Sequence, residues 1–502
     1  MKIEGNAKLI KFESDVQLVK YNVLKEVAKS AFKGNLQQDY KKVIKEVADE
    51  MDTISRCCIY KERAIIEERV KLAMGGDKDN PNVIEVISAA CDECPVNRFL
   101  ITEACRGCLA HKCKDACPFG AIYYVGKRAY IDYTKCKECG RCKAACPYNA
   151  IAEVMRPCMR ACSIGALTYD SDTEKAVINN EDCVQCGACA AACPFGAIVD
   201  KSYIVNVIDL IKRKKEKDDI NIYAVVAPAI ASQFTFATIG QVVRAIKTLG
   251  FREVLEAALG ADIVAEHETN EFAHALQEGK NIMTSSCCPA FVKYIQKKYP
   301  ELADDVSTSV SPMIAVARLV KQMDEKAKVI FIGPCTAKKA EMNLEDLKGS
   351  VDYVLTFEEL LALLDASGIQ VDKCEEDPLD NASFYGRIFA RSGGLTEAVA
   401  HVVESNNLDV DFKPIVCNGL KECDMALKLA KINRAKGNFI EGMACEGGCI
   451  SGPGTIRHGV RAKNEVDKYA KISTEKGVKE SLRVFDVDKL NLERDYSKIL
   501  KK

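Results

Sequence analysis

A chain of 502 residues is long enough for two to four domains around a large buried core. Hydrophobic residues make up 48% and charged residues 28%, as in ordinary globular proteins, and the net charge of −1 gives no electrostatic reason to bind nucleic acid or an anionic membrane. No apolar run approaches the roughly 18 residues of a membrane-spanning helix, and the first residues lack the apolar core of a signal peptide. We therefore expect a cytoplasmic protein that has neither nucleic acid nor a membrane as a partner.

Cysteine dominates the metal-ligand chemistry of this chain, which has 26 cysteines and only 5 histidines. Thiols are kept reduced in the cytoplasm, so this many cysteines indicates metal binding and not disulfides. The near absence of paired cysteine and histidine spacings argues against zinc fingers. Thiolate is the soft ligand that iron–sulfur clusters select, and we expect clusters of that kind.

Residues 1–90 are predicted to form a helical N-terminal region. Residues 40–51 and 61–74 place apolar side chains at helical spacing among Lys and Glu, and Gly and Pro residues then end the pattern. Cys57 and Cys58 lie here without the spacing of metal ligands, and we expect them to be packed thiols of a helix.

Residues 91–205 are predicted to form an α+β iron–sulfur domain like the bacterial ferredoxins. The sequence Cys-Pro-Phe-Gly-Ala-Ile occurs at 117–122 and again at 193–198, with variants at 146–151 and 162–167. Repeats of this kind indicate a duplicated supersecondary unit.

The cysteine spacing in this domain is that of [4Fe–4S] ligands. Two runs have the ferredoxin spacing, in which three closely spaced cysteines are followed by a fourth before proline, and a third run is slightly expanded. The runs are Cys136, Cys139, Cys142 and Cys146; Cys183, Cys186, Cys189 and Cys193; and Cys105, Cys108, Cys113 and Cys117.

The ligands can be paired because the distal cysteine of a run ligates the partner cluster in two-cluster ferredoxins. Cys146 is expected to join the first three cysteines of the 105–117 run, and Cys117 those of the 136–146 run. Cys162 is expected to join the first three cysteines of the 183–193 run.

A fourth accessory site stays open at this point. The ligands left over for it, if it exists, are Cys158, Cys193, Cys91 and Cys94. The chain is therefore expected to hold at least three accessory [4Fe–4S] clusters, with a fourth left open.

Residues 219–474 are predicted to form an α/β catalytic domain with parallel sheets in two lobes, because apolar strands alternate with helical segments. The expected strands are 221–226, 328–332, 353–356, 414–417 and 439–442, and the expected helices include 239–249, 311–323 and 395–405. The remaining residues, 475–502, are charged and are expected to form a peripheral tail.

Three cysteine segments of this domain, at 284–289, 333–338 and 441–449, follow predicted strands. Open α/β sheets place their sites at the carboxyl ends of strands. The segments supply the four thiolates that a cubane cluster needs, namely Cys288, Cys335, Cys445 and Cys449. Adjacent cysteines point in different directions, so Cys287 is expected to be a free thiol beside the metal centre and a candidate proton shuttle.

The three segments read Ser-Cys-Cys-Pro, Pro-Cys-Thr-Ala-Lys-Lys-Ala-Glu and Glu-Gly-Met-Ala-Cys-Glu-Gly-Gly-Cys, and in this order they resemble the signatures of the [FeFe]-hydrogenases. The resemblance covers roughly residues 95–470. It implies that the four cysteines hold the [4Fe–4S] part of an H-cluster. It also implies that Cys449 bridges to a diiron subcluster with CO, cyanide and azadithiolate ligands.

The same resemblance implies a dry, apolar pocket around the diiron unit. Lys338 would hydrogen-bond one cyanide, which is a charge-assisted contact. The other residues that the resemblance places in this pocket are Met443, Phe389, Pro228, Ala229, Pro312 and Met313.

The resemblance also implies a proton path that begins at Cys287 and continues in family members through Glu, Ser and Glu. Ser307 follows Cys287 by 20 residues, as the family pattern requires, and Glu268 and Glu271 share one helical face. Glu266 is also near in sequence. The alternative is that these carboxylates are ordinary surface groups.

Several positions depart from the commonest family pattern. Phe291 replaces a usual Trp, Gly333 a usual Met, Ala229 a frequent Ser and Met313 a frequent Gln, and Ala275 stands where an arginine would extend the proton path. The chain therefore looks like a less-studied clostridial-type branch, group B. We expect these changes to affect the catalytic bias and the outer proton path.

The implied function is that of a ferredoxin hydrogenase of anaerobic metabolism, which interconverts H₂ with two protons and two electrons of reduced ferredoxin. Ferredoxin is the expected partner because the chain has no flavin or dinucleotide module, and separate maturation proteins would build the diiron cofactor. Two alternatives are a hydrogen sensor of the same fold and a non-catalytic iron–sulfur assembly or electron-transfer protein. Sensors usually lack the relay cysteine and assembly proteins lose the diiron pocket, so Cys287, Lys338 and Met443 favour the enzyme.

Overall fold

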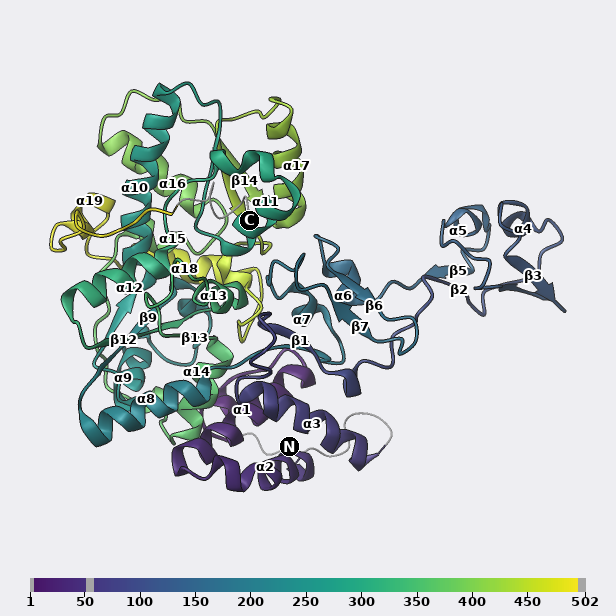
Figure 1. The fold of residues 1–502 in the computed structure, drawn as a ribbon, viewed down its shortest axis with the longest axis horizontal. Helices are drawn as coiled ribbons and strands as arrows, with labels where there is room; N and C mark the ends of the chain where they lie inside the picture. Colours follow the sequence, from purple (N-terminus) through teal and green to yellow (C-terminus); the bar gives the residue numbers. More distant parts are fainter. Residues whose placement is uncertain (1–3, 51–57, 495–502) are drawn as a thin grey trace.

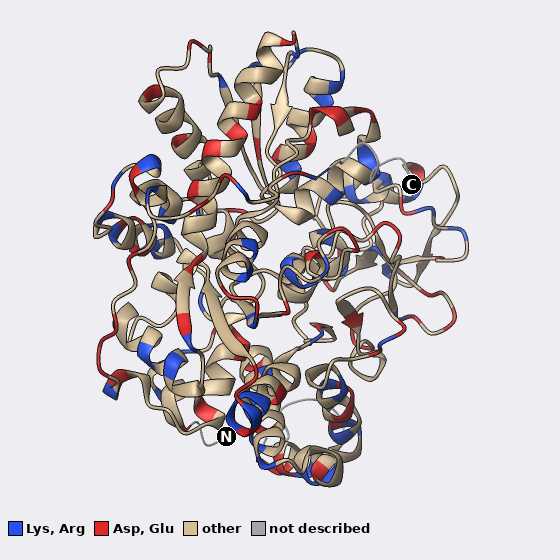
Figure 2. Ribbon diagram, turned by 60° about the vertical axis from the view of Figure 1, so that its left-hand side comes forward, with Lys and Arg blue, Asp and Glu red and all other residues tan. Residues whose placement is uncertain are grey.

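The computed structural model describes residues 4–50 and 58–494. Figure 1 shows a large α/β body, a group of N-terminal helices beneath it, and two cysteine-rich modules beside it, of which the outer one projects away from the body. Acidic and basic residues are interspersed over the outer helices (Figure 2). Within the described ranges, no helix combines the length and the apolar character that a membrane span requires.

The larger sheet of the α/β body has four parallel strands in the order β10–β9–β12–β13. β12 pairs with β9 over six residues, from Ala327 opposite Asn221 to Ile332 opposite Val226. The strands are β9 (Asn221–Val226), β10 (Glu253–Glu256), β12 (Ala327–Ile332) and β13 (Tyr353–Leu355), and the helices packed on them include α8 (Ile204–Lys217), α9 (Ile239–Leu249) and α12 (Pro312–Met323).

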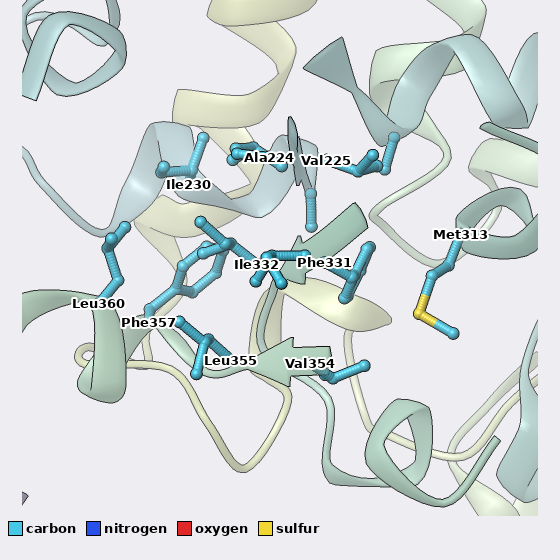
Figure 3. Packing of buried hydrophobic residues seen from close by; sticks show 14 of the residues in the cluster. Ala224, Val225, Ile230, Met313, Phe331, Ile332, Val354, Leu355, Phe357 and Leu360 are labelled. Atoms are coloured by element: carbon cyan, nitrogen blue, oxygen red, sulfur yellow. The ribbon is translucent and has the colours of Figure 1, made fainter. Parts of the chain in front are cut away.

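Buried apolar side chains fill the space between this sheet and its helices (Figure 3). Val225, Phe331 and Ile332 are at most 4% exposed, and they lie near Met313 of α12 and Phe357 of α14 (Phe357–Ala366). Burial of such surface stabilises the fold by roughly 25 cal/mol per Å². Because this core is close-packed, it fixes the strand ends from which the catalytic loops start.

The smaller sheet has three parallel strands in the order β11–β15–β14, so the predicted two-lobed α/β architecture is confirmed. Its strands are β11 (Met283–Thr284), β14 (Pro414–Asn418) and β15 (Phe439–Met443), and its flanking helices are α11 (Pro289–Lys298) and α17 (Leu420–Lys431). The long helix α10 (Ala257–Gln277) packs against α12, and also against α15 (Phe384–Ile388), α16 (Gly394–Ser405) and α19 (Val478–Leu482).

Short helices connect these layers. They are α13 (Thr336–Glu341), α18 (Arg461–Lys471) and the 3₁₀ turns η3 (Pro228–Ser232), η4 (Pro300–Asp305), η5 (Val371–Lys373) and η6 (Cys449–Ser451).

Each cysteine-rich module pairs short antiparallel strands with one-turn helices, as an α+β ferredoxin-like domain requires. The outer module contains β2 (Phe99–Ile101), α4 (Lys112–Asp115), β3 (Ile122–Val125), β4 (Arg128–Ile131), α5 (Arg141–Ala145) and β5 (Ile151–Glu153). The inner module contains β1 (Ile84–Val86), η2 (Ser88–Ala90), α6 (Pro157–Ala161), β6 (Leu167–Tyr169), β7 (Ala176–Ile178), α7 (Ala188–Ala192) and β8 (Ile198–Asp200).

The sequence repeat is also a repeat of backbone conformation. The second residue after the first cysteine of each ferredoxin run has a positive φ, at Gly107, Glu138 and Gln185. A non-glycine residue adopts this left-handed conformation only at a cost in conformational free energy. Backbone strain of this kind is found most often at functional sites. The third residue after the last cysteine repeats the feature at Gly120, Asn149, Gly165 and Gly196.

The N-terminal region is helical, as predicted. Its elements are η1 (Gly5–Leu9), α1 (Asp15–Lys33), α2 (Leu36–Glu50) and α3 (Ile59–Ala73). The Ser14 side chain accepts a hydrogen bond from Gln17 N at 3.3 Å and caps α1. Cys57 lies outside the described residues. Cys58 is exposed at the N-cap of α3, so the expectation of a packed thiol is wrong for it, because the helix begins one residue later.

A buried ion network joins the N-terminal region, the inner module and the α/β body. Lys339 of α13 is fully buried, and its Nζ lies 2.8 Å from Asp200 Oδ2 and 2.9 Å from Glu359 Oε2. Lys20 of α1 reaches the same Asp200 at 2.7 Å and Glu358 at 2.6 Å. Three parts of the chain that are distant in sequence therefore share one set of charges.

The expectation of a peripheral C-terminal tail is wrong for the described residues up to 494. Val478 and Leu482 of α19 are buried, and Ser481 Oγ donates to Asp262 Oδ2 of α10 at 2.8 Å. Further on, Val310 N donates to Leu492 O at 2.8 Å. The segment is rich in charged residues, but its apolar residues Val478 and Leu482 are buried.

Candidate active site

Four predicted cluster ligands start from strand ends in the two lobes. Cys335 follows β12 and is the N-cap of α13, and Cys288 lies between β11 and α11 as the N-cap of α11. Cys445 and Cys449 follow β15, the latter at the start of η6. Because the carboxyl ends of both parallel sheets face the same space, the four cysteines meet there.

A small cavity of about 20 Å³ lies among these four cysteines, and Cys186 of the inner module also lines it. Burial, together with the neighbouring thiols, raises the pKa of Cys335 to about 11 and that of Cys449 to about 12. Four buried thiolates would repel one another without a compensating cation. This donor set therefore fits a cluster of iron and sulfide, which supplies the positive charge.

A second cavity of about 80 Å³ adjoins the first, and it is lined mostly by apolar side chains. Residues predicted from the sequence that line it are Pro228, Pro312, Met313, Phe389, Met443, Lys338, Cys287, Cys288, Cys335 and Cys449. Ala229 is buried in η3 next to the cavity and is not among the lining residues. The apolar walls, which include Ala257, Ala258 and Ala261 of α10, fit a group that must be kept from water.

Lys338 brings a buried positive charge to this cavity. Its Nζ lies 2.8 Å from Glu341 Oε2 and 3.3 Å from the carbonyl oxygen of Cys287. Burial alone would lower the pKa of Lys338, but Glu341 outweighs this effect and raises it. Ser311 Oγ donates to the same carboxylate oxygen at 3.0 Å. Glu341 was not predicted as a site residue, although its position three residues after Lys338 on a helix was a usable signal.

The predicted proton-path residues lie close together. Glu268 and Cys287 interact electrostatically, and Ser307 and Glu271 both lie beside Glu268. Ser307 Oγ donates to Glu271 Oε2 at 2.7 Å. Glu268 is fully buried and Glu271 is half-buried, so they are not ordinary surface groups. By contrast, Glu266 accepts a hydrogen bond from Asn406 Nδ2 at 2.9 Å.

Glu268 has a raised proton affinity because of its position. Burial, together with the charge of Glu271, raises the pKa of Glu268 to about 8. Its Oε1 accepts hydrogen bonds from Ser286 N at 3.0 Å and Ser286 Oγ at 3.3 Å. Ser286 was not predicted as a site residue, because nothing in the sequence brings it to α10.

Two of the unusual pocket residues have a steric explanation. A side chain at Gly333 would meet the ring of Phe331, whose Cε1 lies 2.5 Å from the Cβ position, so Phe331 fills the space that a larger residue would take. Similarly, a Cβ at Gly442 would lie 2.2 Å from the ring of Phe291. Gly333 is thus matched by an aromatic neighbour, and Phe291 is matched by a glycine that leaves room for its ring.

The accessory cysteines have the backbone environment of cluster ligands. Backbone N–H groups donate to their Sγ atoms at 3.3 to 3.5 Å, and the acceptors are Cys91, Cys105, Cys117, Cys136, Cys146, Cys183 and Cys193. Such bonds stabilise sulfur that carries negative charge and tune cluster potentials. Among the described residues, no group of ligand-type side chains is close enough to hold a single metal ion.

The inner module brings together the cysteines left over by the ferredoxin pairing. Burial, together with the neighbouring thiols of Cys193, Cys94 and Cys91, raises the pKa of Cys158 to about 11. Cys189 has Cys186, Cys183 and Cys162 as its nearest thiol neighbours, which is the predicted set around Cys162. Cys186 in turn lies beside Cys288 at the small cavity.

The outer module brings together two further sets. Cys113, Cys108 and Cys105 all neighbour Tyr124, whose hydroxyl lies 3.3 Å from Cys113 Sγ. Cys142 neighbours Cys136 and Cys117, which is the predicted exchange of the distal cysteine. Cys139 is exposed and Cys146 half-buried in the same module.

The fold and the site define an iron–sulfur protein in which ferredoxin-like modules lead to a buried, cysteine-lined centre between two α/β lobes. Residues 220–453 match the family model of the iron-only hydrogenase large subunit, C-terminal domain. Residues 104–150 and 128–194 match models of 4Fe–4S dicluster domains.

Relatives among known proteins agree with these matches. The chain is 27% identical to iron hydrogenase 1 of Clostridium pasteurianum over 78% of this chain and 77% of that protein. It is 28% identical to the periplasmic [Fe] hydrogenase large subunit of Nitratidesulfovibrio vulgaris over 49% of this chain and 70% of that protein. A probable cytosolic Fe–S cluster assembly factor of Aedes aegypti is 27% identical over 42% of this chain and 55% of its own length.

An apo [FeFe]-hydrogenase structure from Chlamydomonas reinhardtii superposes with a TM-score of 0.47 and 20% identity, over 57% of this chain and 95% of that chain. On the family-model match and the hydrogenase relatives, the chain belongs to the iron-only, or [FeFe], hydrogenase family of oxidoreductases.

Proposed function

We propose that the protein catalyses the reversible formation of H₂ from two protons and two electrons, with reduced ferredoxin as the electron donor. The observation that carries the proposal is that Cys287 and Lys338 line one apolar cavity together with three of the four proposed cubane ligands. An H-cluster bound at Cys288, Cys335, Cys445 and Cys449 would supply the metal redox chemistry of this reaction.

The residues around the cavity would move and hold protons and charge. Lys338, kept cationic by Glu341, would orient an anionic ligand of the cofactor through a charge-assisted hydrogen bond. The Cys287 thiol is buried, and burial raises its pKa well above the usual value, so it would hold its proton at the cavity wall. Glu268, protonated at neutral pH, would return a proton to Cys287 and be recharged through Ser307 and Glu271.

Electrons would reach the centre through the accessory clusters. The two sets of cysteines in the outer module would receive them, and the two sets in the inner module would pass them on. The set that includes Cys186 lies next to Cys288, so the last transfer would cross a short distance. The thiols of Cys91, Cys94, Cys158 and Cys193 would hold a fourth accessory cluster.

The relatives named as assembly factors leave a non-catalytic iron–sulfur role, or a sensor role, as the alternatives to be tested. The enzymatic function is supported by the presence of all the predicted relay and pocket residues, namely Cys287, Lys338, Glu268, Ser307 and Glu271. A protein that only bound a cubane cluster would not need a buried acid next to a thiol.

The test is H₂ evolution by the full chain after maturation with the diiron cofactor, with reduced methyl viologen as a small electron donor. We expect turnover, together with infrared bands in the CO and cyanide region that shift under H₂. The Cys287→Ala variant should keep these bands and lose about 100-fold or more in turnover, as expected when a relay acid is removed.

Two controls separate the alternatives. Cys417→Ala removes a buried thiol that lies outside both cavities, and its turnover should stay within about twofold of the wild type. Bands without turnover in the wild type would indicate a sensor. A complete iron content without any CO or cyanide bands would contradict the hydrogenase function.

A further inference from the structure

The outer cysteine-rich module carries an unusual surface. This module, residues 96–154, is called the arm here, and it projects from the rest of the molecule (Figure 1). The arm has ten Lys and Arg residues against five Asp and Glu, whereas the remainder of the chain has 61 against 67. A basic module on an otherwise acidic chain produces a local field that attracts an acidic partner.

Several of the arm's cations have no ion-pair partner in the part of the chain that the structure describes. Six exposed Lys and Arg side chains of the arm form no ion pair among the described residues, namely Arg106, Lys112, Lys114, Lys127, Lys137 and Arg141. Only Asp115 and Glu138 of its acids lack a salt bridge in the same described part. The excess positive charge therefore faces solvent.

Large apolar side chains are also concentrated on the arm. Of the twenty exposed large hydrophobic residues in the described chain, seven lie between 109 and 148. Leu109 is 97% exposed and Val125 is 59% exposed. Exposed apolar groups that are rimmed by polar residues mark interaction sites, and tyrosine and arginine are enriched in protein interfaces.

The hairpin of β3 and β4 organises this surface. Tyr123 lies opposite Tyr130, and their rings stack on the outer face at 5.8 Å between centroids. Tyr124 points to the other face, where its hydroxyl meets Cys113 Sγ at 3.3 Å. Tyr123 on the outer face is therefore adjacent in the strand to Tyr124, whose side chain contacts the predicted cluster ligand Cys113.

The loop that carries Cys105 and Cys108 packs against the turn of the same hairpin. A Cβ at Gly107 would lie 2.2 Å from the carbonyl oxygen of Lys127, so only glycine permits this contact. Arg106 and Leu109 belong to this loop and Lys127 to the turn. Cations, apolar groups and cluster cysteines therefore meet at one end of the arm, which we call the arm tip and define as Arg106, Leu109, Tyr123, Val125, Lys127 and Tyr130.

We propose that the arm tip is the docking surface for an acidic electron-transfer protein, a ferredoxin, which would deliver electrons to the cluster held by Cys105, Cys108 and Cys113. The proposal rests on the proposed function and names the surface that its electron donor uses. Charge complementarity would steer the encounter, and Leu109, Val125 and the tyrosine pair would form its desolvated centre.

The test compares two electron donors on the full, matured chain. In the double variant Arg106→Glu and Lys127→Glu, kcat/KM for a bacterial two-cluster ferredoxin should fall about tenfold or more at low salt, because attraction becomes repulsion. Turnover with methyl viologen, a small donor that needs no docking surface, should not change. The decrease of the ferredoxin rate with added salt should also become shallower in the variant.

Two matched variants control for charge and position. Arg106→Lys with Lys127→Arg keeps the charge and should retain the wild-type ferredoxin rate within about twofold. Lys463→Glu with Lys479→Glu changes two exposed lysines of the α/β body by the same amount and should also retain it. Equal losses in all the double variants, or a parallel loss of the methyl viologen rate, would overturn the proposal.

A binding measurement separates this proposal from the proposed function. Calorimetry with the oxidised ferredoxin should give a Kd about tenfold weaker for the Glu double variant, whether or not the chain evolves H₂. Normal methyl viologen turnover without ferredoxin binding by the wild type would overturn the docking surface and leave the hydrogenase function standing. A wild-type dimer that the double variant converts to a monomer would show instead that the arm tip binds a second copy of the chain.

Discussion

Burial disfavours the charged forms of Lys338 and Glu268 alike, but of the two only Lys338 lies beside a described group of opposite charge. Lys338 keeps its charge because Glu341 lies 2.8 Å from its Nζ. Glu268 has no cation beside it, so burial raises its pKa to about 8 and favours the neutral acid. Once the Cys287 thiol had given up its proton, the neutral Glu268 acid would reprotonate the thiolate, and the same exchange in the opposite direction would serve the reverse reaction.

The Glu268→Gln variant tests this difference. Glutamine still accepts the hydrogen bond from Ser286 N but cannot release a proton, so methyl viologen turnover should fall about 100-fold or more. Glu266→Gln is the matched control, because Glu266 accepts its hydrogen bond from Asn406 Nδ2, and its turnover should stay near the wild-type value.

The stability of the same variant should depend less on pH. The pKa of Glu268 rises from 4.5 to about 8 on folding, so between these pH values the folded state binds more protons than the unfolded state. Its contribution to stability is therefore present below about pH 4.5 and is lost as the pH rises through about 8. The melting temperature of wild type should fall more steeply than that of Glu268→Gln between pH 6 and 8.5. Identical slopes would contradict the buried neutral acid.

At the scale of elements, the N-terminal helices brace the inner module against the α/β body. Burial alone would raise the pKa of Asp200, but Lys20 and Lys339 outweigh it and lower the pKa below its usual range. The carboxylate of β8 is thus held between α1 and α13. Arg69 of α3 adds a bond from its Nη2 to Gly196 O at 2.8 Å, just beyond Cys193. The N-terminal region therefore fixes the segment that carries one proposed ligand.

The Lys339→Met variant tests this brace. Removal of the ammonium leaves the buried carboxylates of Asp200 and Glu359 with less positive charge beside them. Breaking a buried ion pair lowers the free energy of unfolding by about 3–5 kcal/mol. We expect the melting temperature to fall by about 5 °C or more. Lys348→Met is the control, because that side chain is 71% exposed and lies 3.5 Å from Glu345, and its effect should stay within about 0.5 kcal/mol. A shift of equal size in both variants would argue against the brace.

At the scale of the whole molecule, the four proposed sets of accessory cysteines would form a series from the arm tip to the proposed active site. The proposed fourth site is the one that the sequence leaves open. Cys91→Ser together with Cys94→Ser should remove its cluster, and the iron content of the chain should fall by about four atoms.

Cys58→Ser is the matched control for this count, because Cys58 is exposed at a helix N-cap. Its iron content should equal that of the wild type. An unchanged content in the Cys91 and Cys94 double variant would mean that these thiols are not cluster ligands, and the series would then contain three accessory clusters.

Several strands and helices of the α/β body were predictable because they have a strong local pattern, whereas the bounds of β10, β11 and α10 were not predicted. The expected strand 221–226 and helix 239–249 match β9 and α9 residue for residue. Other features have no local pattern. Cys58 lies one residue before a helix start, and the charged C-terminal segment buries Val478 and Leu482, so composition alone led to the wrong expectation for both.

The sequence by itself determined which residues could be ligands, because cysteine spacing within a loop is set by the reach of a few residues around one cluster. It also indicated the relay residues through a resemblance in motif order. Only the tertiary structure decided that Cys158 lies with Cys91, that Ser286 bonds Glu268 and that Lys20 reaches Asp200. These partners come from segments far apart in the chain, and the packing of whole elements, which no local pattern encodes, brings them together.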